Sequence, residues 1–186
     1  MAKLIYCMIT SLDGYTEDAQ GRFDWGISED EPVLAFINEL CASVRTYLYG
    51  RRIYETMLYW ETAPTGADQS AAERDFTLQW KSARKFVYSR TLTEPRSADT
   101  WIERTFDVEA IRQLKAESAH DISVNGPELA AQALAAGLVD EICPIVCPVI
   151  VGGGKRFLPD GLQLDLELLE ARPFASGVVV MRYARR

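Results

Sequence analysis

Histidine, paired cysteines and paired catalytic carboxylates are scarce or missing in this sequence. The single histidine, His120, precedes a predicted strand, so a Ser-His-Asp hydrolase would depend on a residue better placed for a structural role. The four cysteines are spread out and form no Cys-x-x-Cys motif, which argues against zinc and redox sites and favours buried thiols in a reducing cytoplasm. No two carboxylates have a spacing typical of glycosidases. We therefore expect no metal site and no hydrolytic site.

A long apolar run and an excess of positive charge are missing as well. No apolar run approaches the ~20 residues that span a bilayer. The stretch MAKLIYCMITSLDG is too short and too soon interrupted for a signal peptide. The formal net charge of −7 disfavours a broad surface for nucleic acid or membrane. We expect a cytoplasmic protein that binds a small-molecule substrate, with no nucleic-acid and no membrane partner.

The residues that are present indicate one globular domain of the α/β class, residues 1–186. Hydrophobic residues make up 48% and charged residues 25% of the chain, which is enough to bury a core. Short apolar runs alternate with helix patterns in the first two thirds, and strand patterns dominate the last third. That order predicts a mostly parallel sheet flanked by helices and completed by an antiparallel meander. The expected strands cover residues 3–10, 46–49, 85–88, 100–104, 121–124, 139–158, 162–172 and 177–185.

Capping residues mark the expected helix ends. Pro32 suits a first helical turn, with Ser28 or Asp30 as the cap. Asp107 suits the start of a later amphipathic helix. Gly137 is a natural end for the alanine-rich helix before it.

Four predicted strand ends are candidates to bind a ligand, and three of them carry residues suited to an anion. In open α/β sheets, ligands bind outside the carboxyl ends of the strands. Glycine lets the backbone approach a ligand closely, helix starts offer free N–H groups, and arginine offers a planar charged fork that matches phosphate. The residues at these ends are Ile9 and Thr10, then Gly50, Arg51 and Arg52, then Ser89, Arg90 and Thr91, and then Asn125, Gly126, Pro127 and Glu128.

Three such places in an acidic protein indicate a ligand with several phosphates, such as a dinucleotide that carries a pyrophosphate and a 2′-phosphate. The alternative is that they are caps, turns and solvated arginines. Glu128 opposes a phosphate directly over the last helix start unless its side chain points away. No GxGxxG follows a strand, and VGGGK lacks the spacing of a P-loop, so a turn or bulge is the simpler interpretation of that glycine run.

Candidate substrate-contacting residues follow the first strand. Asp13 lies at the strand's exit and is the candidate for substrate contact or proton relay, with a plain Asp-Gly turn as the alternative. Asp24 and Trp25 are candidates to line the mouth of the substrate site at this strand exit. Trp25 either closes over that mouth as part of a lid or packs on the domain.

Five segments, in their order and spacing, resemble the dihydrofolate-reductase-like superfamily, in particular its riboflavin-biosynthesis reductase branch. They are ITSLDGY, YLYGRRIYETM, KFVYSRTL, ISVNGPELAAQAL and DEICPIVCPVIVGGGKRFL, and together they span nearly the whole chain. That branch includes the C-terminal domain of the bifunctional deaminase-reductase. The resemblance implies a three-layer fold around a central mixed, mostly parallel sheet with antiparallel C-terminal strands. It also implies an NADPH-dependent reductase of a small heterocyclic or ribose-linked substrate, similar to 5-amino-6-(5-phosphoribosylamino)uracil reductase of riboflavin biosynthesis.

The resemblance further implies roles for residues at the strand ends. Gly50, Arg51 and Arg52 would hold phosphate, and Ser89, Arg90 and Thr91 would meet the adenosine 2′-phosphate. The turn against the pyrophosphate would be Asn125, Gly126, Pro127, Glu128 and Leu129. Ile9 and Thr10 would flank the nicotinamide, beneath a closing loop with Leu12, Asp13 and Gly14. Gly152, Gly153 and Gly154 match a glycine run near the cofactor or the subunit contact.

Other functions stay open beside this one. Folate reductases place an acid on the first helix, whereas here the inward face of that helix is apolar and neither Glu31 nor Glu39 falls clearly on it. Dihydrofolate reductase is therefore the alternative enzyme, and a nucleotide-binding module without turnover is the non-enzyme alternative. RNA or phosphopeptide binding through the arginines is disfavoured by the negative net charge. There is no zinc motif of the kind a deaminase domain needs.

The apolar C-terminal strands also bear on assembly. The segments CPIVCPVIV and GVVVMRY carry more apolar side chains than one chain is expected to cover. This predicts a homodimer.

Overall fold

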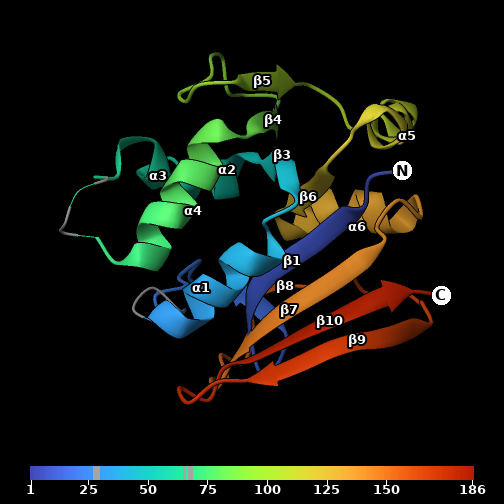
Figure 1. Cartoon of the computed structure of the whole chain (residues 1–186). Helices are drawn as coiled ribbons and strands as arrows, with labels where there is room; N and C mark the ends of the chain where they lie inside the picture. The colour runs from blue at the N-terminus through green and yellow to red at the C-terminus, as the bar shows by residue number, and fades with distance from the viewer. Residues whose placement is uncertain (27–29, 65, 67–68) are drawn as a thin grey trace.

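The computed structural model describes residues 1–26, 30–64, 66 and 69–186, and one eight-stranded sheet forms its framework (Figure 1). The strand order is β5-β4-β3-β6-β1-β7-β10-β9. The first six strands in this order run parallel, and β10 is antiparallel to both β7 and β9. The predicted α/β class and mostly parallel sheet are confirmed. The strands of this sheet are β1 (Leu4–Ser11), β3 (Val44–Gly50), β4 (Arg84–Tyr88), β5 (Thr100–Glu103), β6 (Asp121–Asn125), β7 (Glu141–Cys147), β9 (Leu166–Pro173) and β10 (Val179–Arg185).

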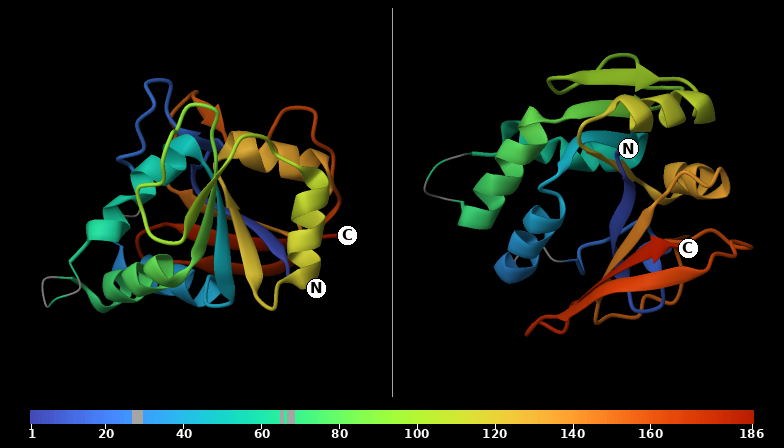
Figure 2. Two further views of the ribbon diagram at one scale, coloured as in Figure 1. Left: turned by 90° about the horizontal axis from the view of Figure 1, so that it is seen from above. Right: turned by 45° about the vertical axis from the view of Figure 1, so that its right-hand side comes forward.

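Helices cover both faces of the sheet and give the molecule three layers. The helices are α1 (Glu31–Leu40), α2 (Arg51–Met57), α3 (Tyr59–Thr62), α4 (Ala71–Ser82), α5 (Val108–Glu117) and α6 (Pro127–Ala135). Figures 1 and 2 show α1 and α4 on one face and α5 and α6 on the other. On the first face, Phe36 of α1 packs in one buried cluster with Ile145 of β7. On the second, Leu129 of α6 packs in another with Tyr6 of β1.

The helix caps follow the expected chemistry, with one correction inside α1. Asp30 caps α1, since its Oδ1 accepts the N–H of Val33 at 3.2 Å; the alternative cap, Ser28, lies outside the described residues. The inward face of α1 was expected to be apolar, but it carries the buried Asn38. The Asn38 amide donates to the carbonyl of Ala72 at 2.8 Å, so it joins α1 to the first turn of α4.

The C-terminal third is not a meander, which corrects the sequence prediction. Strand β10 lies between β7 and β9. The strand that follows first in sequence, β9, is therefore at the outside of the sheet, and the last strand, β10, pairs with β7. The apolar alternation that begins at Leu162 enters the sheet only at Leu166. Leu162 and Leu164 instead pack on the core from a loop. Alternation here therefore reports side-chain burial, not strand pairing.

A small second sheet forms where the sequence predicted a loop and a turn. Strand β2 (Tyr15–Glu17) pairs antiparallel with β8 (Lys155–Arg156). These two segments lie 138 or more residues apart in sequence, as do Thr16 and the Lys155 carbonyl, which its hydroxyl reaches at 3.2 Å. The loop after β1 is thereby attached to the glycine run after β7.

A buried acid joins three strands at the opposite end of the sheet. Glu141 of β7 accepts from Lys3 Nζ at 2.6 Å and from Arg182 Nη2 at 3.0 Å, and its side chain is only 4% exposed. Burial acts to raise the pKa of Glu141, but the hydrogen bonds from Lys3 and Arg182 outweigh it and hold the pKa below its usual value. Glu141 is therefore charged near neutral pH.

The cysteines are free thiols, as expected for a chain without cysteine motifs. Cys143 and Cys147 are buried, whereas Cys7 and Cys41 are half-buried. Burial raises the pKa of Cys41 to about 12, so this thiol is protonated and unreactive at neutral pH. Among the described residues, no helix is both long and apolar enough to cross a membrane.

Candidate active site

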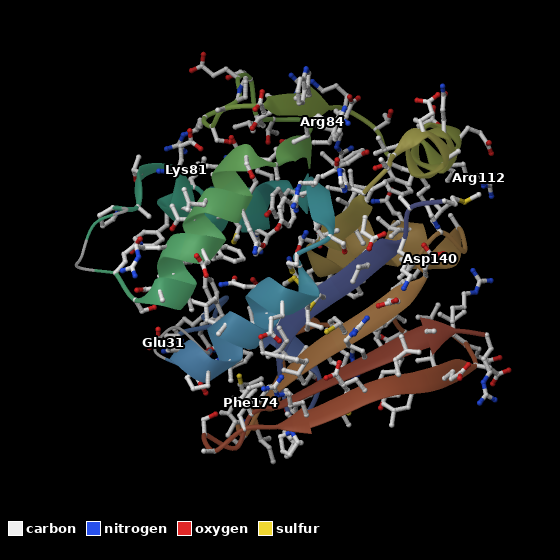
Figure 3. The ribbon with its side chains drawn as sticks, viewed as in Figure 1. Glu31, Lys81, Arg84, Arg112, Asp140 and Phe174 are labelled. Atoms are coloured by element: carbon white, nitrogen blue, oxygen red, sulfur yellow. The ribbon has the colours of Figure 1, made fainter. Side chains whose placement is uncertain are left out.

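The predicted ligand-binding residues come together at one edge of the sheet. Strands β1, β3, β4 and β6 are parallel, so their carboxyl ends share that edge. Arg84 and Asp140, labelled in Figure 3, mark the opposite edge, where β4 begins and where the chain enters β7. All four predicted strand ends are therefore neighbours in the fold.

Two glycines bring the ends of β3 and β6 into close contact. Tyr49 lies opposite Asn125 in the register, so Gly50 and Gly126 follow side by side. Gly126 has φ +96°, and a Cβ there would lie 3.3 Å from Ile53 Cγ2 and 3.7 Å from the Gly50 nitrogen. Only glycine fits this backbone and this space without strain. Gly126 thus lets the ends of β3 and β6 approach each other closely, and α6 starts directly after it at Pro127, with Leu129 buried on the core.

Strand β1 extends past β6 at this edge. The pairing of β1 with β6 ends at Tyr6 opposite Val124, whereas its pairing with β7 continues to Ser11. One backbone edge of residues 8–11 is therefore left without a strand partner in the described part of the chain. Ile9 and Thr10, the residues expected beside a nicotinamide, lie in this stretch, and Thr10 is buried.

Arg51 connects the start of α2 to the turn after β4. Its Nη1 donates to Thr91 Oγ1 at 2.6 Å and its Nε to Glu55 at 2.8 Å. Ser89 is buried, and its Oγ accepts the N–H groups of Thr91 and Leu92, which fixes the turn. The two predicted phosphate-binding groups on α2 and after β4 are thus parts of one surface.

Arg90 is exposed and, unlike Arg51, has no side-chain partner among the described residues. Within the described residues its guanidinium forms neither an ion pair nor a side-chain hydrogen bond. A cation in this state is ready to meet an anion at no cost to existing contacts.

Glu128, at the start of α6, is paired with a lysine, which offsets the repulsion that it would exert on a phosphate there. Its carboxylate lies 3.0 Å from Lys155 Nζ, so the side chain is directed to β8. Lys155 also lies 3.5 Å from Glu17 Oε1, and Arg52 lies 3.3 Å from the same oxygen. Sequence reasoning did not single out Lys155 or Glu17. Lys155 ends the VGGGK run, of which only the glycines were considered as binding residues, and nothing in the local sequence marks Glu17.

Asp13 is used by the structure to fix a loop. Its carboxylate accepts the N–H of Gly152 at 2.8 Å and the N–H of Val151 at 3.2 Å. Desolvation acts to raise the pKa of Asp13, but hydrogen bonds from Ser11 and from these two N–H groups outweigh it, so the pKa lies below its usual value. An ionised carboxylate with both oxygens engaged is a poor proton donor. These contacts favour a structural role for Asp13, and its catalytic role stays a prediction.

The other predicted loop residues differ in how firmly they are placed. Gly14 has φ +83° and its carbonyl accepts the N–H of Phe157 at 2.9 Å, which attaches the loop to β8. Leu12 is 63% exposed at the surface of the loop. Gly153 lies between the two glycines that turn the chain toward β8, and nothing contacts a Cβ placed on it. Asp24 lies in the turn beside Trp25.

Two polar atoms are buried without partners near the ends of β1 and β7. Trp25 packs in the same cluster as Ile9, and its Nε1 is buried with no hydrogen-bond acceptor in the described part of the chain. Asp30 caps α1 with one oxygen, and its Oδ2 is buried with no donor among the described residues. Burial, and then the charge of Asp30, raise the pKa of the Cys147 thiol, which places this carboxylate close to the end of β7. Sequence reasoning treated Asp30 only as a cap.

The fold and this edge define the class of protein. The arrangement of a mostly parallel sheet, helices on both faces and an antiparallel C-terminal hairpin is that of the dihydrofolate-reductase-like fold. Dihydrofolate reductase from Enterococcus faecalis superposes with a TM-score of 0.64 at 12% identity, over 99% of this chain and 96% of that one. At this identity the likeness shows the fold alone.

The chain belongs to the RibD C-terminal domain family, which matches residues 2–180. The uncharacterized protein YyaP of Bacillus subtilis is 30% identical over 184 residues, which is 97% of this chain and 94% of that protein. A solved structure from Shewanella sp. PV-4, named for riboflavin biosynthesis, superposes with a TM-score of 0.74 at 20% identity, over 100% of this chain and 99% of that one. The resemblance stated from the sequence is confirmed.

Proposed function

We propose that this protein is an NADPH-dependent reductase of a small heterocyclic or ribose-linked substrate, similar to 5-amino-6-(5-phosphoribosylamino)uracil reductase. The observation that carries the proposal is the convergence of Gly50, Gly126 and the arginines of α2 and the β4 turn at one sheet edge. Membership of the RibD C-terminal domain family and the riboflavin-related name of the Shewanella protein support the reductase role. The Enterococcus faecalis dihydrofolate reductase was solved with NADP(H), which supports this cofactor class.

The residues present fit a dinucleotide with a 2′-phosphate. Gly126 lets the ends of β3 and β6 approach closely where a diphosphate would cross them, because a side chain there would meet Ile53 and Gly50. Arg90 is an uncommitted cation on the same surface as Arg51. Bound NADPH supplies the hydride, and the protein's task is to orient it against the substrate and to exclude water. The substrate would lie beside the unpaired edge of residues 8–11.

The first experiment compares thermal stabilisation by NADPH and by NADH. A ligand that binds only the folded protein adds about 2.7 kcal/mol at a hundredfold excess over Kd, which for a chain of this size is on the order of 5–10 °C. We expect the larger shift with NADPH, and we expect Arg90→Gln to remove the difference between the two cofactors. Arg84→Gln, at the other end of β4, is the matched control and should behave as wild type. Equal shifts with both cofactors in the wild-type protein would contradict the role of Arg90.

Dihydrofolate reductase is the second candidate, and Asp30 favours it. A buried carboxylate oxygen at the start of α1, with no donor among the residues that the structure describes, is suited to accept N–H groups of a pterin ring. This position partly meets the objection that neither Glu31 nor Glu39 faces inward. Titration with methotrexate separates the two enzymes, because tight binding would favour the folate site. NADPH binding without oxidation by any reducible substrate would favour the nucleotide-binding module.

We also propose a homodimer built on the face of β7, β10 and β9 that α1 does not cover. On the covered face, Ile145 and Val180 are paired and buried. On the uncovered face, Leu168 is 55% exposed, opposite Tyr183. Apolar residues that share this face and are half-buried or exposed are Pro144, Val146, Leu168, Ala171, Val179, Met181 and Tyr183. A second copy would cover them. A cytoplasmic location fits the free thiols and stays a prediction.

A further inference from the structure

Two cations near the proposed diphosphate site, Arg52 and Lys155, already hold carboxylates. Glu17 Oε1 lies 3.3 Å from Arg52 Nη1 and 3.5 Å from Lys155 Nζ, so a single oxygen contacts both cations. Lys155 holds a second carboxylate, that of Glu128, at 3.0 Å. Side chains of Glu17 and Lys155 are only 21% and 22% exposed, so this contact is partly shielded from water.

These four charges belong to four different elements around one opening. Glu17 is on β2, Arg52 on α2, Glu128 on α6 and Lys155 on β8. Together with the turn after β2 and with Gly154, three of them line an open cleft of about 710 Å³. Arg52 and Glu128 each follow one of the two glycines, Gly50 and Gly126, by two residues, so these charges start from the strand ends proposed to hold the diphosphate.

The backbone of Glu17 is held more firmly than its side chain. Gly154 has φ +132°, and a Cβ on it would overlap the Glu17 carbonyl oxygen, so only glycine lets β2 rest on this segment. The neighbouring Thr16 hydroxyl donates to the Lys155 carbonyl at 3.2 Å. The carboxylate, by contrast, is held in place only by its two cations among the described residues. It can swing away without unpairing β2 from β8.

We propose that Glu17 is an internal counter-ion, which occupies Arg52 and Lys155 in the free protein and which a diphosphate-bearing ligand displaces. A diphosphate brought to these cations carries the same sign of charge as Glu17, so the two compete for the same positions. Glu17 thereby lowers the affinity for anionic ligands and makes their binding depend on movement of its side chain. The inference rests on the proposed NADPH site and adds how access to that site is controlled.

The size of the effect follows from the exposure of the two ion pairs. Pairs of this kind contribute modestly, so loss of the competing carboxylate should tighten anion binding by about two- to tenfold. Glu17→Gln keeps the shape of the side chain and removes its charge. Glu17→Asp keeps the charge and shortens the side chain, so it should hold the cations less well and give an intermediate value. Glu117→Gln, on the last residue of α5, changes the net charge equally and is the control.

The test is calorimetric titration of the wild-type protein and these variants with NADPH and, separately, with inorganic pyrophosphate. We expect Glu17→Gln to bind both probes more tightly than wild type and Glu117→Gln to match wild type. Equal or weaker NADPH binding by Glu17→Gln would overturn the counter-ion while leaving the cofactor site intact. If Glu17→Gln bound pyrophosphate more tightly but neither protein bound NADPH, the proposed function would be wrong and the counter-ion role of Glu17 would be supported. Absence of binding of either probe to any variant would remove both, and Glu17→Asp decides the matter if Glu17→Gln fails to fold.

Discussion

Substitution of Gly126 by alanine tests two roles of the turn after β6. One is the backbone conformation that only glycine adopts without strain, measured as stability, and the other is NADPH binding. Gly126 has φ +96° and ψ 124°, which lies outside the left-handed region that other residues visit. Holding alanine there costs about 1–3 kcal/mol. The added Cβ also meets Ile53 Cγ2 at 3.3 Å, a contact that requires the isoleucine to shift. For a chain of this size, each 1 kcal/mol lowers the melting temperature by about 2–4 °C.

The assay pairs this variant with Gly161→Ala. Gly161 has φ +77°, and a Cβ there contacts nothing within 4 Å, so it carries a backbone cost without the steric contact. We expect both variants to melt at a lower temperature. Only Gly126→Ala should also lose NADPH affinity, by at least about tenfold, because the contact of its methyl group with Ile53 and Gly50 would push apart the strand ends proposed to hold the diphosphate. If Gly126→Ala bound NADPH as well as Gly161→Ala does, the crevice at the β3 and β6 ends would not be the diphosphate site.

Three further predictions concern acid stability, the loop after β1 and assembly. The pKa of Glu141 is lower in the folded protein than in the unfolded chain. Its contribution to the free energy of unfolding is therefore fully present above the unfolded pKa of about 4.3 and is lost as the pH falls through the lower folded pKa. Glu141→Gln should therefore cost about 1–3 kcal/mol at pH 7 by urea denaturation, and much less at pH 3; an equal loss at both pH values would contradict this. Asp13→Asn should reduce turnover far more than NADPH affinity, measured by nicotinamide absorbance and by titration, because it weakens the contacts with Val151 and Gly152 that fix the loop after β1. Unchanged turnover would remove any role for this acid in the reaction. Leu168→Glu should yield a monomer in light scattering, whereas Leu78→Glu, on an equally exposed leucine of α4, should not; a monomeric wild-type protein at micromolar concentration would end the dimer proposal.

Local patterns predicted the strand ends because each pattern is short and chemically specific. Gly50 followed by two arginines, and Asn125 followed by Gly126 and Pro127, each mark where a buried strand stops and a helix begins. The α/β order then implied that these ends share one edge, since parallel strands joined by helices all point the same way. This part of the prediction needed no knowledge of contacts between distant residues.

The surroundings of those ends were not predictable in the same way. Glu17, Arg52 and Lys155 meet only because β2 pairs with β8, and neither segment carries a strand pattern long enough to recognise. Asp13 looked like a free acid at a strand exit until its contacts with the N–H groups of Val151 and Gly152 were known. An ionisable side chain does not reveal from its neighbours in sequence which distant donors it will find.

The sequence by itself determined the parallel core, the places where its strands stop and the glycines that those stops require, because periodicity and turn chemistry are local properties of the chain. The tertiary structure alone decided that β10 lies between β7 and β9, that Asp13 fixes a loop and that Glu17 lies on two cations. Those outcomes depend on pairings between segments far apart in sequence, whose register is set by the packing of the whole sheet.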